Sequence, residues 1–381
     1  MKIKFTLLLF SILTLASCAE KAIKVEVSNP TDNERKNEII SLFWSDISVQ
    51  LLLNDSDELI ILDEAGAQIP YQLIFNEQSK AQEIIFSTSL LGSQKKTYEI
   101  KKGSPEYFKI LTHGRAVPER KDDFAWENDR IAFRMYGPAL AAENASNGVD
   151  IWLKRTEELV LEKFYSDELK NGISYHEDHG LGLDCYKVAR TLGAGGIAPF
   201  VNDTLWVGRN YTSATLIDQG PLRTSFRLVY ESAELGNKTY TQTLTVSLDA
   251  GSQMNKAIVS YDGDFEFLPI AAGIWLHKEL GIINYDIDKK YIAYAENAVS
   301  DAGIHSGRNY VGLVFTNPLS EICQHSEHIL GLSRYKKGRE FTYYFGSGWS
   351  KWGFETDQEW FDYVEKFSQD IEMPLQVQII K

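Results

Sequence analysis

The chain has 381 residues, with 53 acidic against 39 basic side chains and a formal net charge of −14. This excess of acid argues against nucleic acid as a partner, because binding to backbone phosphates requires a basic face. The length exceeds what one simple hydrophobic core usually holds, and it favours two domains or one very large sandwich.

The N-terminus has the pattern of an export signal. Lys2 and Lys4 precede an apolar run over residues 5–16, which is too short to cross a membrane as a mature helix. The run ends in LASC at residues 15–18, which resembles a bacterial lipobox. This resemblance implies cleavage before Cys18 and lipid attachment to its thiol. We therefore interpret residues 1–18 as a lipoprotein signal peptide with its lipobox cysteine; an ordinary secreted protein is the alternative.

Export also decides how the other cysteines are interpreted. Lipid chains hold a protein at the membrane while its domains stay in water, so we expect a lipid-anchored protein in the periplasm or on the outer-membrane surface. Disulfides are permitted there, and Cys185 and Cys323 either form one bridge or remain two free thiols. Neither has a CxxC neighbour, which argues against a structural zinc site.

Residues 19–110 predict a small N-terminal β-sandwich. Short runs rich in β-formers, such as IKVEVSN, ISVQLLL and EIIFSTSLL, alternate with turn residues at short intervals. DEAGAQ at residues 63–68 supplies the turn of a hairpin. Gly, Pro and mixed charges interrupt the alternation over residues 102–123, which we take as the domain boundary.

Residues 111–381 predict a second, larger β-domain. Most segments are rich in aromatic and β-branched residues, and only two stretches favour helix: TEELVLEKFYSDELKN at 156–171, and a segment that begins with a capping box from Thr356 to Glu359. PLQVQII at the C-terminus is expected to return to the sheet. The fold class is therefore all-β, a large antiparallel β-supersandwich preceded by a small β-sandwich, with few helices.

Several long motifs of the second region resemble one family of bacterial lipoproteins encoded in polysaccharide-utilisation loci. They are DDFAWENDRIAFRMYGPAL, GVDIWLKR, YHEDHGLGLDCYKVARTLGAGG, GPLRTSFRLVY, SLDAGSQMNK and YYFGSGWSKWG. GPLRTSFRLVY followed by LTVSLDAGSQMNKAIVSY also resembles the galactose-mutarotase-like supersandwich, so residues 111–381 would be the catalytic domain. The resemblance implies glycan metabolism and leaves the reaction open.

The stretch SYHEDHGLGLDCYKV at residues 174–188 concentrates ionisable side chains. His176, Asp178 and His179 converge only if the backbone turns, and the glycines that follow favour a turn. The three residues then either bind a divalent metal or supply a histidine base with a carboxylate that orients it. The alternative is a polar connection in which these side chains bond loop amides. No other cofactor is predicted.

Elimination from a uronate needs a base, an acid and a positive group for the C6 carboxylate. His176 or His179 is the expected base, Tyr186 the acid, and Lys187, Arg134 or Arg190 the neutralising group. The alternative for Tyr186 is a structural role in which its ring packs in the hydrophobic core. The arginines, which include Arg130 and Arg155, lie on strands of alternating character, which also suits an ordinary solvated face.

Two further groups are candidate substrate contacts. His277 and Glu296, together with His179, supply the two histidines and the glutamate that mutarotase-like epimerases place around a sugar. In GSGWSKWG, residues 346–353, a tryptophan face can stack on a pyranose while a lysine bonds its edge, which nominates Trp349, Lys351 and Trp352. Core packing is the alternative for one of the tryptophans.

The sequence thus predicts an exported carbohydrate-active enzyme that acts on a uronate-containing oligo- or polysaccharide by β-elimination. A glycosidase or a sugar epimerase on the same fold is one alternative, and a non-enzymatic glycan-binding lipoprotein is another. The expected partners are the saccharide and, through the lipid alone, the membrane.

Overall fold

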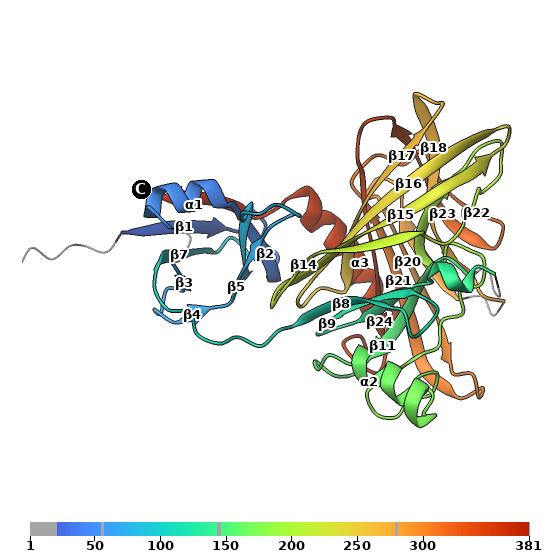
Figure 1. Ribbon diagram of the computed structural model, residues 1–381, viewed down its shortest axis with the longest axis horizontal. Helices are drawn as coiled ribbons and strands as arrows, with labels where there is room; N and C mark the ends of the chain where they lie inside the picture. Colours follow the sequence, from blue (N-terminus) through green and yellow to red (C-terminus); the bar gives the residue numbers. More distant parts are fainter. Residues whose placement is uncertain (1–20, 55–56, 143–145, 279–280, 381) are drawn as a thin grey trace, which may run out of the picture.

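The computed structural model describes residues 21–54, 57–142, 146–278 and 281–380. They form a small β-sandwich at one end of the molecule and a large one at the other (Figure 1). Both are built from antiparallel sheets, which confirms the predicted all-β class. The expected signal peptide and Cys18 lie outside the described residues. No helix within these ranges is long and apolar enough to span a membrane.

The small sandwich contains the strands of residues 22–102. They are β1 (Ala22–Ser28), β2 (Arg35–Phe43), β3 (Leu59–Leu62), β4 (Gln68–Ile69), β5 (Tyr71–Ile74), β6 (Glu83–Leu90) and β7 (Lys95–Lys102). One sheet has the order β25-β1-β7-β3-β4 and the other β2-β6-β5. The inward residues of alternating strands, among them Val25, Ile61 and Phe86, form its core. The predicted turn at 63–68 joins β3 to β4.

One segment of this region was predicted wrongly as a strand. ISVQLLL lies mostly in α1 (Trp44–Leu51), whose buried residues are Ile47 and Leu51. These two residues are four apart and therefore share one helix face, while Val49 between them is 70% exposed. A short apolar run does not distinguish a buried helix face from a strand, which explains the error.

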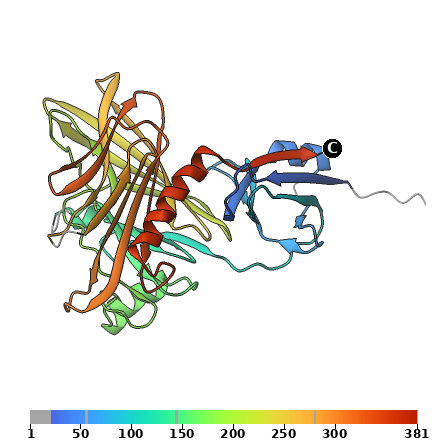
Figure 2. The ribbon, with the colours of Figure 1, turned by 180° about the vertical axis from the view of Figure 1, so that it is seen from behind.

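The C-terminal strand also differs from the prediction. β25 (Gln376–Ile380) pairs with β1 of the small sandwich, not with the sheets of the large one. The chain leaves the large sandwich through α3 (Asp357–Glu372) and crosses back, as Figure 2 shows from behind. The capping box predicted at the start of α3 is present: Thr356 caps the Glu359 amide and the Glu359 side chain returns to the Thr356 amide.

The large sandwich contains all other strands. They are β8 (Thr112–Val117), β9 (Asp123–Asn128), β10 (Ala132–Met135), β11 (Val149–Lys154), β12 (Gly182–Asp184), β13 (Ala194–Pro199), β14 (Ser213–Gln219), β15 (Arg223–Leu235), β16 (Lys238–Asp249), β17 (Met254–Gly263), β18 (Phe267–Trp275), β19 (Ile282–Asp286), β20 (Tyr291–Val299), β21 (His305–Phe315), β22 (Glu321–His325), β23 (His328–Lys336) and β24 (Phe341–Trp349).

These strands form three sheets around one main core. The long sheet has the order β14-β15-β16-β17-β24-β21-β20-β19, and the shorter sheets are β12-β11-β10-β9-β8 and β13-β18-β23-β22. Phe133 and Ile274 from the shorter sheets and Phe345 from the long sheet belong to the same buried cluster. On its other face the long sheet is covered by α3, through Trp360 and Val364.

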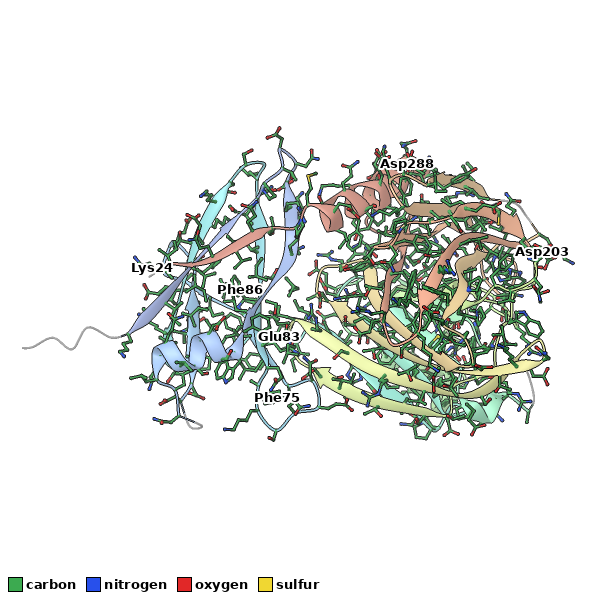
Figure 3. The ribbon with its side chains drawn as sticks, turned by 90° about the horizontal axis from the view of Figure 1, so that it is seen from above. Lys24, Phe75, Glu83, Phe86, Asp203 and Asp288 are labelled. Carbon is green, nitrogen blue, oxygen red and sulfur yellow. The ribbon has the colours of Figure 1, made fainter. Side chains whose placement is uncertain are left out.

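Side-chain hydrogen bonds to the backbone join the two sandwiches. Gln72 of β5 accepts a bond from the Arg223 amide at 2.8 Å and donates one to the Arg223 carbonyl at 3.0 Å. The carboxylate of Asp218 accepts bonds from the amides of Phe75 and Asn76 at 2.8 and 3.0 Å. Figure 3 shows Phe75 at the side of the small sandwich that faces the large one.

Candidate functional site

The site is built on the outer face of the sheet β12-β11-β10-β9-β8. Side chains alternate along β11, so Ile151 faces the main core while Asp150 and Trp152 face outward. The outward face is covered by α2 (Leu161–Ser166) and by the segment that carries the histidines. Trp152 is stacked on Tyr175 of that segment, with ring centroids 4.7 Å apart. Of the stretch predicted as helix at 156–171, residues 161–171 are helical, as α2 and the π-helical turn Asp167–Asn171, whereas residues 156–160 are not.

Glu127 fixes the start of α2. Its carboxylate accepts hydrogen bonds from the backbone amides of Val160 and Leu161 at 2.9 and 2.8 Å, and from the Lys154 ammonium at 2.8 Å. A carboxylate at a helix N-terminus is stabilised by unpaired amides and by the helix dipole. Both side chains of the Glu127 and Lys154 pair are fully buried, so this pair has a structural role.

Arg134 is the centre of a buried charge cluster beneath the histidine segment. Its guanidinium donates hydrogen bonds to Asp150 and Asp184, each at 2.8 Å, and to the Tyr175 hydroxyl at 3.0 Å. Its side chain is 2% exposed. Burial and the neighbouring Asp150 charge hold the pKa of Asp184 well above its usual range, although Arg134 opposes this shift.

The prediction that Arg134 neutralises a substrate carboxylate therefore needs correction. The guanidinium is enclosed by the rings of Tyr136, Trp152 and Tyr175, at 4.8 to 5.6 Å from their centroids. A substrate cannot reach a side chain whose hydrogen bonds and faces are already occupied inside the protein. Arg134 instead holds β10, β11 and β12 together and supports the segment above it.

The two histidines of the segment are each held through one ring nitrogen. Nδ1 of His176 lies 3.1 Å from the Asp184 carbonyl oxygen, and Nε2 of His179 lies 3.0 Å from the Ser174 carbonyl oxygen. A carbonyl oxygen only accepts, so these nitrogens carry the hydrogen in a neutral ring. The other nitrogen, Nε2 of His176 and Nδ1 of His179, then has a lone pair that can take a proton. Both rings have the tautomer of a general base.

Asp178 points to cations and not to the histidines. Its carboxylate lies 3.2 Å from the Arg155 guanidinium and 3.9 Å from the Lys351 ammonium. Two partly exposed cations thus share one carboxylate, which leaves one positive charge in excess. We call His176, Asp178, His179, Arg155 and Lys351 the loop rim. Within the described ranges no three His, Cys, Asp or Glu side chains converge as metal ligands, and a divalent metal here stays a prediction.

Both ends of the segment are attached to the turn between β20 and β21. Glu177 accepts a hydrogen bond from the Ala302 amide at 3.0 Å, and the Lys187 ammonium lies 3.5 Å from Asp301. The Lys187 side chain is 72% exposed and available to a ligand. The exposed Arg190 donates a weak hydrogen bond to the Val207 carbonyl at 3.4 Å.

Tyr186 does not have the surroundings of a catalytic acid. It is buried in the main core, and its hydroxyl donates a hydrogen bond to the Trp275 carbonyl at 3.0 Å. Burial raises the pKa of this phenol well above its usual range. The packing alternative is therefore the correct one for Tyr186, because its alternation with Val188 directs it inward.

His277 and Glu296 do lie together, at the end of β18 and on β20. Nδ1 of His277 is 2.7 Å from the Glu296 carboxylate, and Nε2 is 2.8 Å from the Lys187 carbonyl. Glu296 also accepts a bond from the side-chain amide nitrogen Nδ2 of Asn309 at 3.1 Å. The pair fixes the end of the histidine segment, while His179 is bonded to Ser174 instead of joining it.

The two tryptophans of GSGWSKWG differ in exposure. Trp349 is 1% exposed and its indole nitrogen donates to the Ser306 carbonyl at 2.6 Å, so its predicted stacking on a sugar is wrong. Trp352 is only half-buried, and the Arg130 guanidinium lies 5.4 Å from its ring centroid. The Lys351 ammonium, which belongs to the loop rim, lies 5.3 Å from the centroid of the Trp349 ring.

A cavity beside the histidine segment was not foreseen. Lys163 and Asp167 line it from α2 and the turn that follows, and they form an ion pair at 2.6 Å. Their spacing of four residues is the one signal in the sequence that could have placed them on the same face. The cysteines, which the sequence left open, are both free thiols in the described ranges.

Together these features define an all-β protein of two sandwiches in which one loop at a sheet end gathers histidines, cations and a cavity. The family profile described as "Domain of unknown function (DUF4861)" matches residues 27–377, so the chain belongs to this family. "Uncharacterized protein P7" of Formosa agariphila is 28% identical over 388 residues, which cover 96% of each chain.

Two solved structures from Enterococcus faecalis share the fold. An α-mannosidase of strain V583 has a TM-score of 0.52 at 9% identity, over 95% of this chain and 46% of that one. A protein in the Glycosyl Hydrolase Family 38 has a TM-score of 0.52 at 8% identity, over 96% and 48%. The chain thus spans about half the length of these relatives, and at such identity the likeness shows the fold alone.

Proposed function

We propose that the protein is a carbohydrate-active enzyme that cleaves a uronate-containing oligo- or polysaccharide by β-elimination at the loop rim. The observation that carries this proposal is the orientation of His176. Its Nδ1 is held by the Asp184 carbonyl at 3.1 Å, and its side chain is 31% exposed, so Nε2 is the free basic nitrogen. A base anchored in this way can abstract a proton without first reorienting.

The loop rim offers each group that the elimination needs. Arg155 and Lys351 receive the C6 carboxylate, because they share only the single negative charge of Asp178. His176 removes the C5 proton, and the electron pair forms the C4–C5 double bond as the C4–O bond breaks. The imidazolium that forms on His176 then gives the proton to the leaving oxygen. The products are a 4,5-unsaturated uronate and a new hydroxyl end, and no oxidant or reductant is consumed.

One comparison and one structural feature support saccharide as the substrate class. The solved structures that share the fold are titled as an α-mannosidase and as a member of a glycosyl hydrolase family. The half-buried Trp352, with Arg130 over its ring, lies at the end of the turn that carries Lys351 and suits the apolar face of a sugar. A glycosidase that uses the same loop is the second candidate, favoured by those titles.

Incubation with uronate polysaccharides tests the reaction. We expect absorbance from the 4,5-unsaturated product, and we expect His176→Ala to lower kcat/KM by about 10²- to 10⁴-fold, the usual contribution of a general base. His325→Ala is the matched control, since His325 lies on the distant strand β22. New reducing ends without unsaturation would replace the lyase by a glycosidase. Anomer interconversion without cleavage would indicate an epimerase, and binding alone a glycan-binding protein.

We also propose that the enzyme is exported and lipid-anchored through Cys18, in the periplasm or on the outer-membrane surface. The support is the charged start, apolar run and LASC sequence of residues 1–18. Metabolic labelling with a fatty acid should mark the natural protein but not Cys18→Ser. Equal labelling of both would exclude this cysteine as the anchor.

A further inference from the structure

The histidine segment and α2 border a cavity of about 180 Å³ that is partly open to solvent. It is lined by Lys163, Phe164, Asp167, Ile173, Ser174, Tyr175, Glu177, His179, Leu181 and Gly182. The cavity thus borders the loop rim through His179, which belongs to both. None of the reaction steps assigned above uses its other walls.

The volume suits one six-membered ring. An apolar cavity of roughly 150 Å³ in another protein accommodates a benzene molecule. At about 180 Å³, this cavity has room for a single pyranose and is smaller than the roughly 300–1,000 Å³ of pockets that take drug-sized ligands. An oligosaccharide would therefore place one sugar unit here, with the rest of the chain outside.

The lining has an apolar side and a polar side, as a pyranose does. Phe164, Ile173 and Leu181 provide apolar surface for the C–H face of a sugar ring. On the polar side, Glu177 uses one carboxylate oxygen for the Ala302 amide, and His179 uses Nε2 for the Ser174 carbonyl. The second oxygen of Glu177 and Nδ1 of His179 are therefore available to sugar hydroxyls.

The charges of the lining distinguish the cavity from the loop rim. Lys163 is paired with Asp167 at 2.6 Å, so the Glu177 carboxylate leaves the cavity with one negative charge in excess when His179 is neutral. The loop rim has the opposite excess, because Arg155 and Lys351 share Asp178. Like charges repel at short range, so a uronate is disfavoured in the cavity and favoured at the rim.

We propose that this cavity is a binding subsite for one neutral pyranose unit that neighbours the uronate at the loop rim. The inference rests on the proposed function and specifies its substrate as a saccharide in which uronate and neutral sugar units are adjacent. The cavity selects the neutral unit through shape and charge, while the rim carries out the reaction on the uronate.

Binding of two hexasaccharides to the full-length protein tests the subsite. One contains glucuronate alone, and the other alternates glucuronate with neutral glucose; calorimetry at low temperature gives the dissociation constants. We expect at least tenfold tighter binding of the alternating hexasaccharide. Ile173→Trp, which places an indole in the cavity from a position that is 43% exposed, should abolish this preference and leave the affinity for all-glucuronate unchanged.

Leu169→Trp is the matched control, because Leu169 is 45% exposed on the adjacent turn and does not line the cavity. It should retain the tenfold preference. Equal affinity of the natural protein for both hexasaccharides would overturn the subsite, as would an equal loss of both affinities in Ile173→Trp. Tighter binding of the alternating hexasaccharide without any unsaturated product would support the subsite and contradict the β-elimination. Unsaturated product without this difference in affinity would support the β-elimination and contradict the subsite.

Discussion

The imidazole of His277 bridges the Glu296 carboxylate, 2.7 Å from Nδ1, and the Lys187 carbonyl, 2.8 Å from Nε2. Neither partner can donate when Glu296 is ionised, so both ring nitrogens carry hydrogen and the ring is an imidazolium. Burial alone would lower the pKa of His277, but the hydrogen bond and charge of Glu296 outweigh it and the net pKa is raised above 6.5. The bridge thus ties the histidine segment to β20 in a pH-dependent way.

This bridge predicts that stability falls as the pH rises above about 6.5. A raised folded-state pKa contributes stability that is complete below the unfolded value near 6.5 and is lost as the pH rises through the folded value. Glu296→Gln should cost about 1.5–3 kcal/mol at pH 5.5, the range for a charged hydrogen bond, and less at pH 9. Denaturant titrations at both values measure this. His325→Gln, at a partly buried histidine whose Nε2 lies 3.6 Å from the exposed Asp203, should cost little at either pH. A Glu296→Gln cost independent of pH would contradict the bridge.

Arg134→Met should destabilise the protein by about 3–5 kcal/mol, because it leaves Asp150 and Asp184 buried without their cation. The unfolding midpoint in urea measures the effect. Arg334→Met provides the comparison: Arg334 lies over the exposed Phe267 ring, and its loss should cost less than about 1 kcal/mol. Similar losses of unfolding free energy in the two variants would show that the buried cluster stabilises the protein no more than the exposed contact of Arg334 does.

Tyr186→Phe should leave turnover on uronate polysaccharide within about twofold of the natural protein, since the hydroxyl bonds only a backbone carbonyl in the core. The lost hydrogen bond should lower stability by about 1 kcal/mol. Turnover and thermal unfolding are measured on the same preparation. A drop in kcat of a hundredfold or more, with the fold intact, would show that the Tyr186 hydroxyl takes part in the reaction.

Thr356→Ala should lower stability by about 1 kcal/mol, because it removes the side-chain acceptor for the Glu359 amide at the start of α3. Thr356→Ser keeps the hydroxyl and should recover most of the loss. Thermal unfolding of the three proteins decides between them. If serine is no better than alanine, the cap is not what stabilises the start of this helix.

Apart from α1, the sequence predicted the type of the main elements but not which of their faces are covered. In RIAFRMY the alternation directs Phe133 to the main core and Arg134 to the opposite face, which an isolated strand would expose. That face is covered by α2 and the histidine segment, which follow more than 25 residues later in the sequence. Local patterns contain no information about such long-range packing, so the sequence predicts an accessible Arg134, either as a group that neutralises a substrate carboxylate or on a solvated strand face.

For the site, the composition of the sequence located the loop but did not predict how its side chains are arranged. The crowding of histidines and acids in one segment located the loop, yet Asp178 turned toward Arg155 and Lys351 instead of the histidines. The cavity depends on how α2 lies against this segment, and the Glu127 carboxylate that fixes α2 comes from β9, far away in the sequence.

The pairing of β25 with β1 has a consequence for biosynthesis. Because β25 pairs with β1 and forms one edge of the sheet β25-β1-β7-β3-β4, this sheet lacks its edge strand until β25 has left the ribosome. The usual order, in which the N-terminal domain folds first, is reversed for this sheet. A nascent chain that stalls after α3 would present an unpaired edge of β1, the kind of edge that favours aggregation.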